Sequence, residues 1–185
     1  MVDGMSRIQL FYKDLSEIVG SNGFSVVRLT DTDEKRAVCI ICDKAMSEQM
    51  AIRFNRTPGH EQMLPEVLLR LMGDRTVKNL ELFIYDIEDG QYQVILVDNR
   101  SYSPIPIRIS DAVLMHYIAK IPLYIDQNLM IRQSTPYDAE TTGISIPINT
   151  LDTDRLNREL ERAVADENYR LASYLHEEIK RRHKN

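Results

Sequence analysis

The first part of the chain alternates short apolar runs with polar turns. Apolar or alternating runs at residues 8–12, 24–29 and 37–42 are separated by the polar stretches 20–23 and 31–35. Strands are short and are interrupted by Gly, Asn and Asp, so this pattern predicts three strands connected as a meander.

The period of the apolar positions then changes from that of a strand to that of a helix. Residues 47–54 and 63–72 place apolar side chains among polar ones at helical spacing, with Thr57-Pro-Gly59 between them, which predicts two helices. Alternation returns over residues 77–87 and 92–97, on either side of Glu88-Asp-Gly90. An Asp-Gly pair between two alternating runs predicts a β-hairpin.

A strand, a helix and a further strand complete this region. The two prolines of residues 104–109 restrict that run to the edge of a sheet, because proline has no N–H for the ladder. Ser110 is the expected N-cap of the next helix, and the Asp111 carboxylate suits the positive end of its dipole. Pro122 follows the helix, and residues 123–125 form the last expected strand.

The C-terminal part has a different character. Residues 133–152 are rich in Thr, Ser, Asp, Gly and Pro with little periodicity, and we interpret them as a linker. Two amphipathic helices, broken near residues 166–168, follow within residues 153–185. A hairpin this short buries little apolar surface by itself, so we expect it to pack on its own domain, a second copy or another protein. The predicted architecture is an α+β domain over residues 1–132, with a mixed or antiparallel sheet and packed helices, followed by the linker and an α-helical hairpin.

Composition and charge restrict the class of protein. Of the 185 residues, 43% are hydrophobic and 28% are charged, as in soluble globular proteins. No apolar run approaches the ~20 residues of a membrane-spanning helix, and residues 1–9 lack the apolar core of a secretory signal. We therefore expect a cytoplasmic protein without a membrane partner.

The charge is unevenly distributed along the chain. The net charge is −5, and the eight basic and eight acidic side chains of residues 151–185 cancel, so the first 150 residues hold the acidic excess. Nucleic-acid affinity is built largely from Lys and Arg at phosphates, so this excess argues against an extended phosphate-binding surface. A small metal-assisted site is compatible with it, because a bound divalent ion offsets the repulsion locally.

The only two cysteines, Cys39 and Cys42, form a C-x-x-C pair within a β-branched run. In a strand, residues three apart point to opposite faces and lie roughly 10 Å apart, which is beyond the reach of a disulfide. We expect two buried, reduced thiols. The alternative, a redox or zinc site, needs disulfide chemistry or two further zinc ligands.

The run Arg108-Ile-Ser-Asp-Ala112, its apolar helix and Ile121-Pro-Leu-Tyr-Ile125 together resemble the signature of the bifunctional nuclease family, also called domain of unknown function 151. Upstream, Glu48-Gln-Met-Ala-Ile52 and Arg56-Thr-Pro-Gly-His60 resemble two further motifs of that family, and the resemblance covers roughly residues 7–132. It implies a compact α+β fold, a nuclease acting on both RNA and DNA, and a tendency to oligomerise.

The chain departs from the family signature at two positions. Pro106 and Ile109 stand where the family has an aspartate and a proline. The first departure removes one candidate metal ligand, so it bears on activity more than on fold.

Residues 156–179 are similar to the UVR motif of the bacterial excision-repair nuclease subunits. The matching positions are Ala163, Val164, Glu167, Tyr169, Ala172, Leu175, Glu178 and Ile179. This resemblance implies a hairpin that docks onto a protein.

Phosphodiester hydrolysis needs a positioned water, a charge-neutralising group and a proton acceptor, often with carboxylates that hold Mg²⁺ or Mn²⁺. We interpret Asp111 and Glu48 as candidate metal ligands, and Asp111, Glu48 and His60 as the catalytic set. Arg108 and Ser110 are the candidate substrate-binding residues, since a guanidinium at a helix start suits phosphate.

Each of these residues also has a purely structural interpretation. Ser110 and Asp111 would then only cap a helix, with Arg108 paired to a nearby acid. Glu48 would be solvated or paired with Arg53, and His60 would be a surface residue of a loop.

The leading hypothesis is a broad-specificity, divalent-metal-assisted nuclease of RNA and DNA. Its hairpin, residues 153–185, would bind a protein partner, and the whole would be a homo-oligomer. The alternative is a non-catalytic interaction or regulatory module that retains the fold, which the acidic charge and Pro106 would allow.

Overall fold

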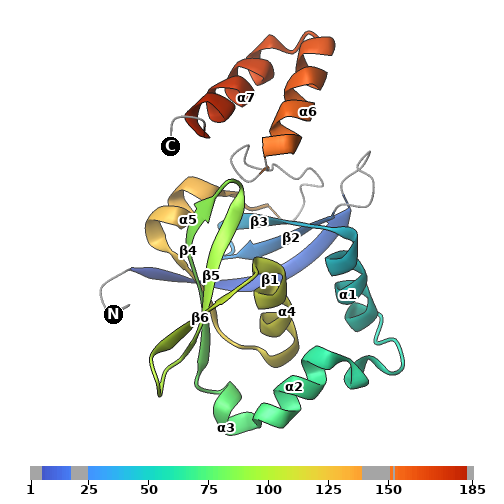
Figure 1. The fold of residues 1–185 in the computed structure, drawn as a ribbon, viewed down its shortest axis with the longest axis vertical. Coiled ribbons are helices and arrows are strands. Elements are labelled where there is room, and N and C mark those ends of the chain that lie inside the picture. The colour runs from blue at the N-terminus through green and yellow to red at the C-terminus, as the bar shows by residue number, and fades with distance from the viewer. Residues whose placement is uncertain (1–5, 18–24, 139–150, 152, 183–185) are drawn as a thin grey trace.

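The computed structural model of the chain describes residues 6–17, 25–138, 151 and 153–182. It consists of a mixed α+β domain and a C-terminal pair of helices, as the sequence predicts (Figure 1). The helix pair stands at the end of the molecule opposite to α2 (Leu64–Met72) and α3 (Asp74–Val77).

The strands of the described residues form one sheet in the order β6-β5-β4-β7-β1-β2-β3-β8. Only β4 and β7 pair in parallel, and the remaining neighbours in this list are antiparallel. The strands are β1 (Arg7–Glu17), β2 (Ser25–Thr30), β3 (Arg36–Cys42), β4 (Leu80–Glu88), β5 (Gln91–Asp98), β6 (Ser103–Ile107), β7 (Leu123–Asp126) and β8 (Ser134–Pro136).

The predicted turns and pairings are confirmed at three places. β1, β2 and β3 form the antiparallel meander, although β1 runs on past a register shift between Tyr12 and Asp14. Asp89 and Gly90 connect β4 to β5 with φ of 45° and 74°, and two consecutive left-handed residues are what a two-residue hairpin turn requires. The proline-containing β6 lies at the edge of the sheet.

Helices pack on this sheet from several directions. α1 (Lys44–Phe54) begins where Asp43 accepts a hydrogen bond from the Met46 N–H at 2.8 Å. α4 (Ile109–Ala119) contacts β1, β4, β5 and β7, while α5 (Gln127–Gln133) contacts β1, β3, β4 and β7. One continuous core results, with side chains such as Leu10, Ile40, Leu82, Val113, Ile125 and Leu129 almost fully buried.

The expectation that Ser110 caps a helix is wrong. Arg108 occupies the N-cap position with extended backbone, and no side chain caps α4. Ile107 pairs with Val94 as the last residue of β6, so the chain leaves the sheet and turns into the helix before Ser110 is reached. Asp111 lies in the first turn, as expected.

Other boundaries differ because of short elements that the periodicity does not reveal. Gly73, with φ of 74°, ends α2 and is followed by the single turn α3, so β4 begins at Leu80. α5 was not predicted, and β8, within the segment interpreted as a linker, pairs with β3. Residues 139–150 of that segment lie outside the described residues.

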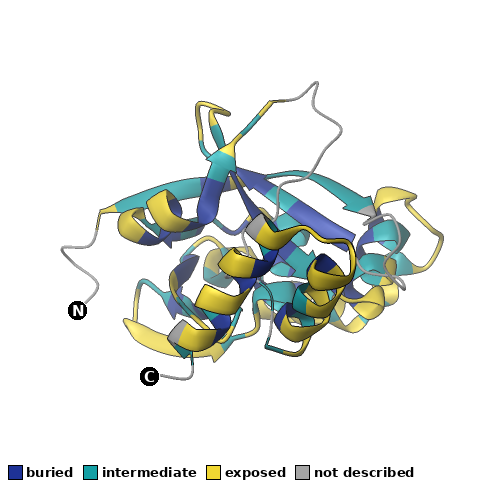
Figure 2. Cartoon of the chain, turned by 90° about the horizontal axis from the view of Figure 1, so that it is seen from above, coloured by how far each residue is buried: buried dark blue, intermediate teal, exposed yellow. Residues whose placement is uncertain are grey.

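The C-terminal helices are α6 (Thr153–Ala165) and α7 (Tyr169–Arg182), and they share a small core of their own. Thr153 Oγ1 donates to Asp89 Oδ1 at 2.6 Å, and Arg182 Nη1 lies 2.9 Å from the same oxygen. These two contacts lower the pKa of the Asp89 carboxyl. Most of the outward surface of the two helices is exposed (Figure 2).

Cys39 and Cys42 are buried, reduced thiols of β3, which confirms the expected environment. Burial raises the pKa of each thiol to about 11, so both are protonated at neutral pH. Among the helices of the described residues, none has the length and apolar character to span a membrane.

Candidate functional site

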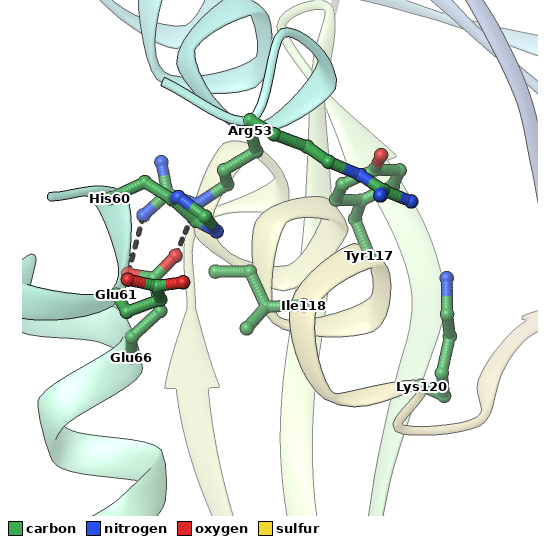
Figure 3. A pocket seen from close by; sticks show the side chains of 8 residues that line it. Arg53, His60, Glu61, Glu66, Tyr117, Ile118 and Lys120 are labelled. Atoms are coloured by element: carbon green, nitrogen blue, oxygen red, sulfur yellow. Dashed lines mark hydrogen bonds and ion pairs between the residues drawn. The ribbon is translucent and has the colours of Figure 1, made fainter. Parts of the chain in front are cut away.

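A pocket of about 420 Å³ lies where the end of α1, the start of α2 and the end of α4 meet (Figure 3). The short 3₁₀ helix η1 (His60–Gln62) forms part of its wall. In Figure 3, Tyr117, Ile118 and Lys120 of the α4 end lie opposite His60 and Glu61. The lining residues are Arg53, Arg56, His60, Glu61, Glu66, Tyr117, Ile118 and Lys120.

A buried ion pair holds one wall of this pocket together. The Arg53 guanidinium donates from Nε and Nη2 to the two carboxylate oxygens of Glu66, both at 2.7 Å. The side chains are only 3% and 9% exposed. Arg53 Nη1 also donates to the backbone oxygen of Gln49 at 2.8 Å. The pair connects α1 to α2, and His60 lies in the turn between these two residues.

His60 projects from a turn that depends on glycine. Gly59 precedes it with φ of 89°, a left-handed conformation that side chains disfavour, although no atom lies where a Cβ would stand. His60 Nδ1 lies 3.0 Å from the carbonyl oxygen of Thr57. A carbonyl only accepts, so Nδ1 carries the hydrogen, and Nε2 of the neutral ring retains a lone pair that can accept a proton.

Two cations complete the pocket. Lys120 ends α4 in left-handed conformation, and its Nζ lies 4.9 Å from the centre of the Tyr117 ring. Arg56 is exposed, and within the described part of the chain no carboxylate forms an ion pair with Arg56 or Lys120. Since Arg53 and Glu66 neutralise each other, Glu61 is the one carboxylate set against these two cations among the lining residues.

Arg108 and Asp111 meet at the opposite end of α4. Arg108 Nε donates to Asp111 Oδ2 at 2.8 Å, and the side chains are 81% and 43% exposed. This hydrogen bond, together with the charges of Asp111 and Asp43, raises the pKa of the Arg108 guanidinium. The predicted pair is therefore together and within reach of solvent. Ser110 lies between its members in the uncapped first turn.

The remaining predicted residue, Glu48, lies on α1. Glu48 is 62% exposed on α1, with its Oε1 3.8 Å from Lys44 Nζ. Nine residues at about 1.5 Å per residue separate Asp111 from Lys120 along α4, roughly 13 Å. The structure thus gives two groups: Arg108 with Asp111 at the start of α4, and His60 with Arg56 and Lys120 at its end.

The described residues contain no group of three or more His, Cys, Asp or Glu side chains placed to hold a metal ion. Mg²⁺ usually keeps several waters and binds one or two carboxylates plus substrate phosphates, so it needs fewer protein ligands than such a group supplies. The carboxylate of Asp111 fits this chemistry, with its Oδ2 shared with Arg108.

Several pocket residues were not found from the sequence. Arg53 and Glu66 are thirteen residues apart on different helices, and no local pattern reveals their pairing. In the sequence, Lys120 is typical of the polar end of a helix and Tyr117 of its apolar stripe, so neither indicates a pocket. Arg56 carried a usable signal, because it begins the Arg56-Thr-Pro-Gly-His60 motif that also contains His60.

Comparison with protein families gives one match to report. Residues 27–138, more than half of the chain, match the family model described as the bifunctional nuclease domain. The matched range includes the whole pocket and the start of α4. A comparison with curated proteins finds no match.

Proposed function

The chain belongs to the bifunctional nuclease family, and on this premise we propose that it hydrolyses phosphodiester bonds of RNA and DNA at the pocket between α1 and α4. One observation carries the proposal. His60, with a proton-accepting Nε2, shares this pocket with two cations that no carboxylate of the described residues pairs with.

The roles follow from the chemistry of the reaction. Arg56 and Lys120 offset the negative charge of the phosphate and hold it against the pocket wall. His60 takes the proton from the attacking water through Nε2 while the water oxygen bonds to phosphorus. The bond from phosphorus to the leaving oxygen breaks, and that oxygen takes a proton from solvent. The Nδ1–H of His60 stays bound to the Thr57 carbonyl oxygen and fixes the ring. The Arg53–Glu66 pair acts through η1, since it holds in place the turn that carries His60.

We propose a divalent ion, Mg²⁺ or Mn²⁺, as the cofactor, with Asp111 as its protein ligand and waters and a substrate phosphate as the others. When bound there, such an ion would neutralise the charge of a substrate phosphate at the start of α4, roughly 13 Å along the helix from the pocket. Arg108 and the N–H groups at Ser110 in the uncapped first turn of α4 would bind a neighbouring phosphate. A nucleic-acid strand that lies along α4 would contact both the Arg108–Asp111 group and the pocket.

Two interaction proposals accompany the nuclease function. The hairpin of residues 153–185 would bind a protein partner, supported by side chains that its own small core leaves exposed. These are Val164, Tyr169 and Tyr174, each more than half exposed. The protein would also form homo-oligomers, for which the exposed face of α2 is the best candidate.

The function is tested by incubating the pure protein with end-labelled single-stranded RNA and DNA in Mg²⁺, Mn²⁺ or EDTA. We expect cleavage of both substrates in either metal and none in EDTA. Asp111→Asn should lose most of this activity, whereas Asp33→Asn, an exposed carboxylate paired with Lys35 in a turn, should retain it.

The contrary results separate the alternatives. Intact RNA and DNA in every condition would leave a non-catalytic interaction module that retains the fold. Cleavage that persists in EDTA and in Asp111→Asn would remove the metal and this ligand from the mechanism while leaving hydrolysis.

A further inference from the structure

Phe54 places an exposed aromatic ring beside the pocket. It is the last residue of α1, and its ring centroid lies 5.0 Å from that of Tyr117 and 5.4 Å from that of Tyr12. Phe54 is 40% exposed, whereas Met46 and Met50 of the same helix are buried. Two ring neighbours hold this side chain, so it offers a preformed surface.

Cations lie around this ring cluster. Tyr117 lines the pocket together with Lys120, whose amine lies over the Tyr117 ring, and with Arg56, two residues after Phe54. A cation attracts phosphate, and an aromatic face stacks on a nucleobase. The site can therefore contact both the phosphate and the base of one nucleotide.

We propose that the pocket takes single-stranded rather than double-stranded nucleic acid, with one base stacked on Phe54 and the adjoining phosphate held by Arg56 and Lys120. The inference rests on the proposed function, because it names the substrate class of the same site.

Duplexes are disfavoured for a geometric reason. Every internal base of a duplex is covered on both faces by its neighbours, so Phe54 reaches a base only where a strand is unpaired or a base has left the stack. An aromatic ring can stack on any of the bases, and stacking makes no contact with the 2′-hydroxyl of the sugar. The same contact therefore serves RNA and DNA without base preference.

The charge of the molecule fits this arrangement. With a net charge of −5, the protein has no excess of cations with which to follow many phosphates. Binding then depends on stacking at Phe54 as well as on the two local cations. A single strand supplies both contacts at one nucleotide.

The test measures binding without turnover. A fluorescently labelled DNA single strand, and the same strand annealed to its complement, are titrated with the full chain in EDTA, and binding is followed by anisotropy. We expect the single strand to bind at least about tenfold more tightly than the duplex. Phe54→Leu should weaken single-strand binding about tenfold, while Phe54→Tyr, which keeps a ring, should bind like the wild type.

Tyr85→Leu is the matched control, because Tyr85 is 43% exposed on β4 and, within the described part of the chain, makes no ring contact with Tyr12, Phe54 or Tyr117. Equal affinity for strand and duplex, or equal affinity of the Phe54→Leu and Tyr85→Leu proteins, would overturn the inference. If Phe54→Leu does not fold, the wild-type ratio of the two affinities decides. Single-strand binding by a protein that cleaves nothing would contradict the nuclease function and leave this inference standing.

Discussion

At the scale of single residues, His116 is a buried titratable group outside the pocket, and both of its ring nitrogens have hydrogen-bond partners. Its Nδ1 donates to the Ile121 carbonyl oxygen at 2.8 Å, and its Nε2 accepts from the Tyr12 N–H at 3.4 Å. Accepting at Nε2 requires the neutral ring. Burial is the main reason why the pKa of His116 is lowered, with a smaller contribution from the charge of Lys120.

This environment predicts a pH dependence of stability. Between the lowered pKa and the unfolded value of about 6.5, the unfolded state binds more protons, so the free energy of unfolding falls as pH falls. The contribution of His116 is fully present above about pH 6.5.

Urea unfolding at a series of pH values from 7.5 to about 5 should show a weaker pH slope of the free energy of unfolding for His116→Asn, which can still donate to the Ile121 carbonyl oxygen. Its control is His176→Asn, an exposed residue of α7, which should keep the wild-type slope. Equal slopes in wild type and His116→Asn would contradict the assignment.

Candidate site residues that belong to local motifs are predictable from the sequence, whereas contacts between distant residues are not. His60, Arg108 and Asp111 are predicted as candidates because motifs and helix starts are local. The sequence suggests Glu48 as a partner of Arg53, whereas Arg53 pairs with Glu66, thirteen residues away on another helix. That contact depends on how α1 and α2 pack and not on neighbouring positions.

At the scale of elements, the buried Arg53–Glu66 pair decides how α1 and α2 are joined. Arg53→Met leaves the Glu66 carboxylate buried without its partner, so we expect a loss of about 3–5 kcal/mol in the free energy of unfolding. Replacing both residues, Arg53→Met with Glu66→Leu, removes the unpaired charge and should recover much of this loss. Denaturant unfolding measures all three proteins.

The control for this cycle is an exposed pair. Lys35→Met breaks the contact of Lys35 with Asp33 and should change stability little, because both side chains are solvated. A double variant no more stable than Arg53→Met would contradict this expectation. It would show that the unpaired charge of Glu66 is not the main cause of the loss in stability.

Elements with strong local signals were predicted well. The meander, the Asp-Gly hairpin and the C-terminal helices each depend on periodicity and turn residues within a short window. Ser110 resembles a cap and predicts a later start for α4 than Ile109, where the helix begins. Pairing of Ile107 with Val94 sets where the preceding strand ends. α5 and β8 are short and were hidden in a polar stretch.

At the scale of the whole molecule, α2 exposes an apolar face at the end opposite to the hairpin (Figure 1). Leu64, Leu68 and Leu71 are 68%, 48% and 82% exposed, at helical spacing on one side. The sheet edges are poorly suited to association, because β6 contains two prolines and β8 is three residues long and ends in proline. A second copy packed on α2 is therefore the expected route to an oligomer.

Light scattering after gel filtration tests this expectation. The wild type should have the mass of at least a dimer, and Leu68→Glu with Leu71→Glu should have that of a monomer. Ile131→Glu, an equally drastic change at a 62% exposed position of α5, should leave the wild-type mass unchanged. A wild type that is monomeric at every concentration would contradict the proposed self-association.

The central claim is that hydrolysis occurs where α1 and α4 end, with His60 as proton acceptor. The most direct test compares single-turnover cleavage of a labelled single strand by the wild type, His60→Gln and His176→Gln, a substitution of an exposed histidine on the hairpin. We predict a rate for His60→Gln about 10²–10⁴-fold below that of the wild type, with His176→Gln unchanged. A His60→Gln protein that cleaves at the wild-type rate would contradict the claim and place the chemistry elsewhere.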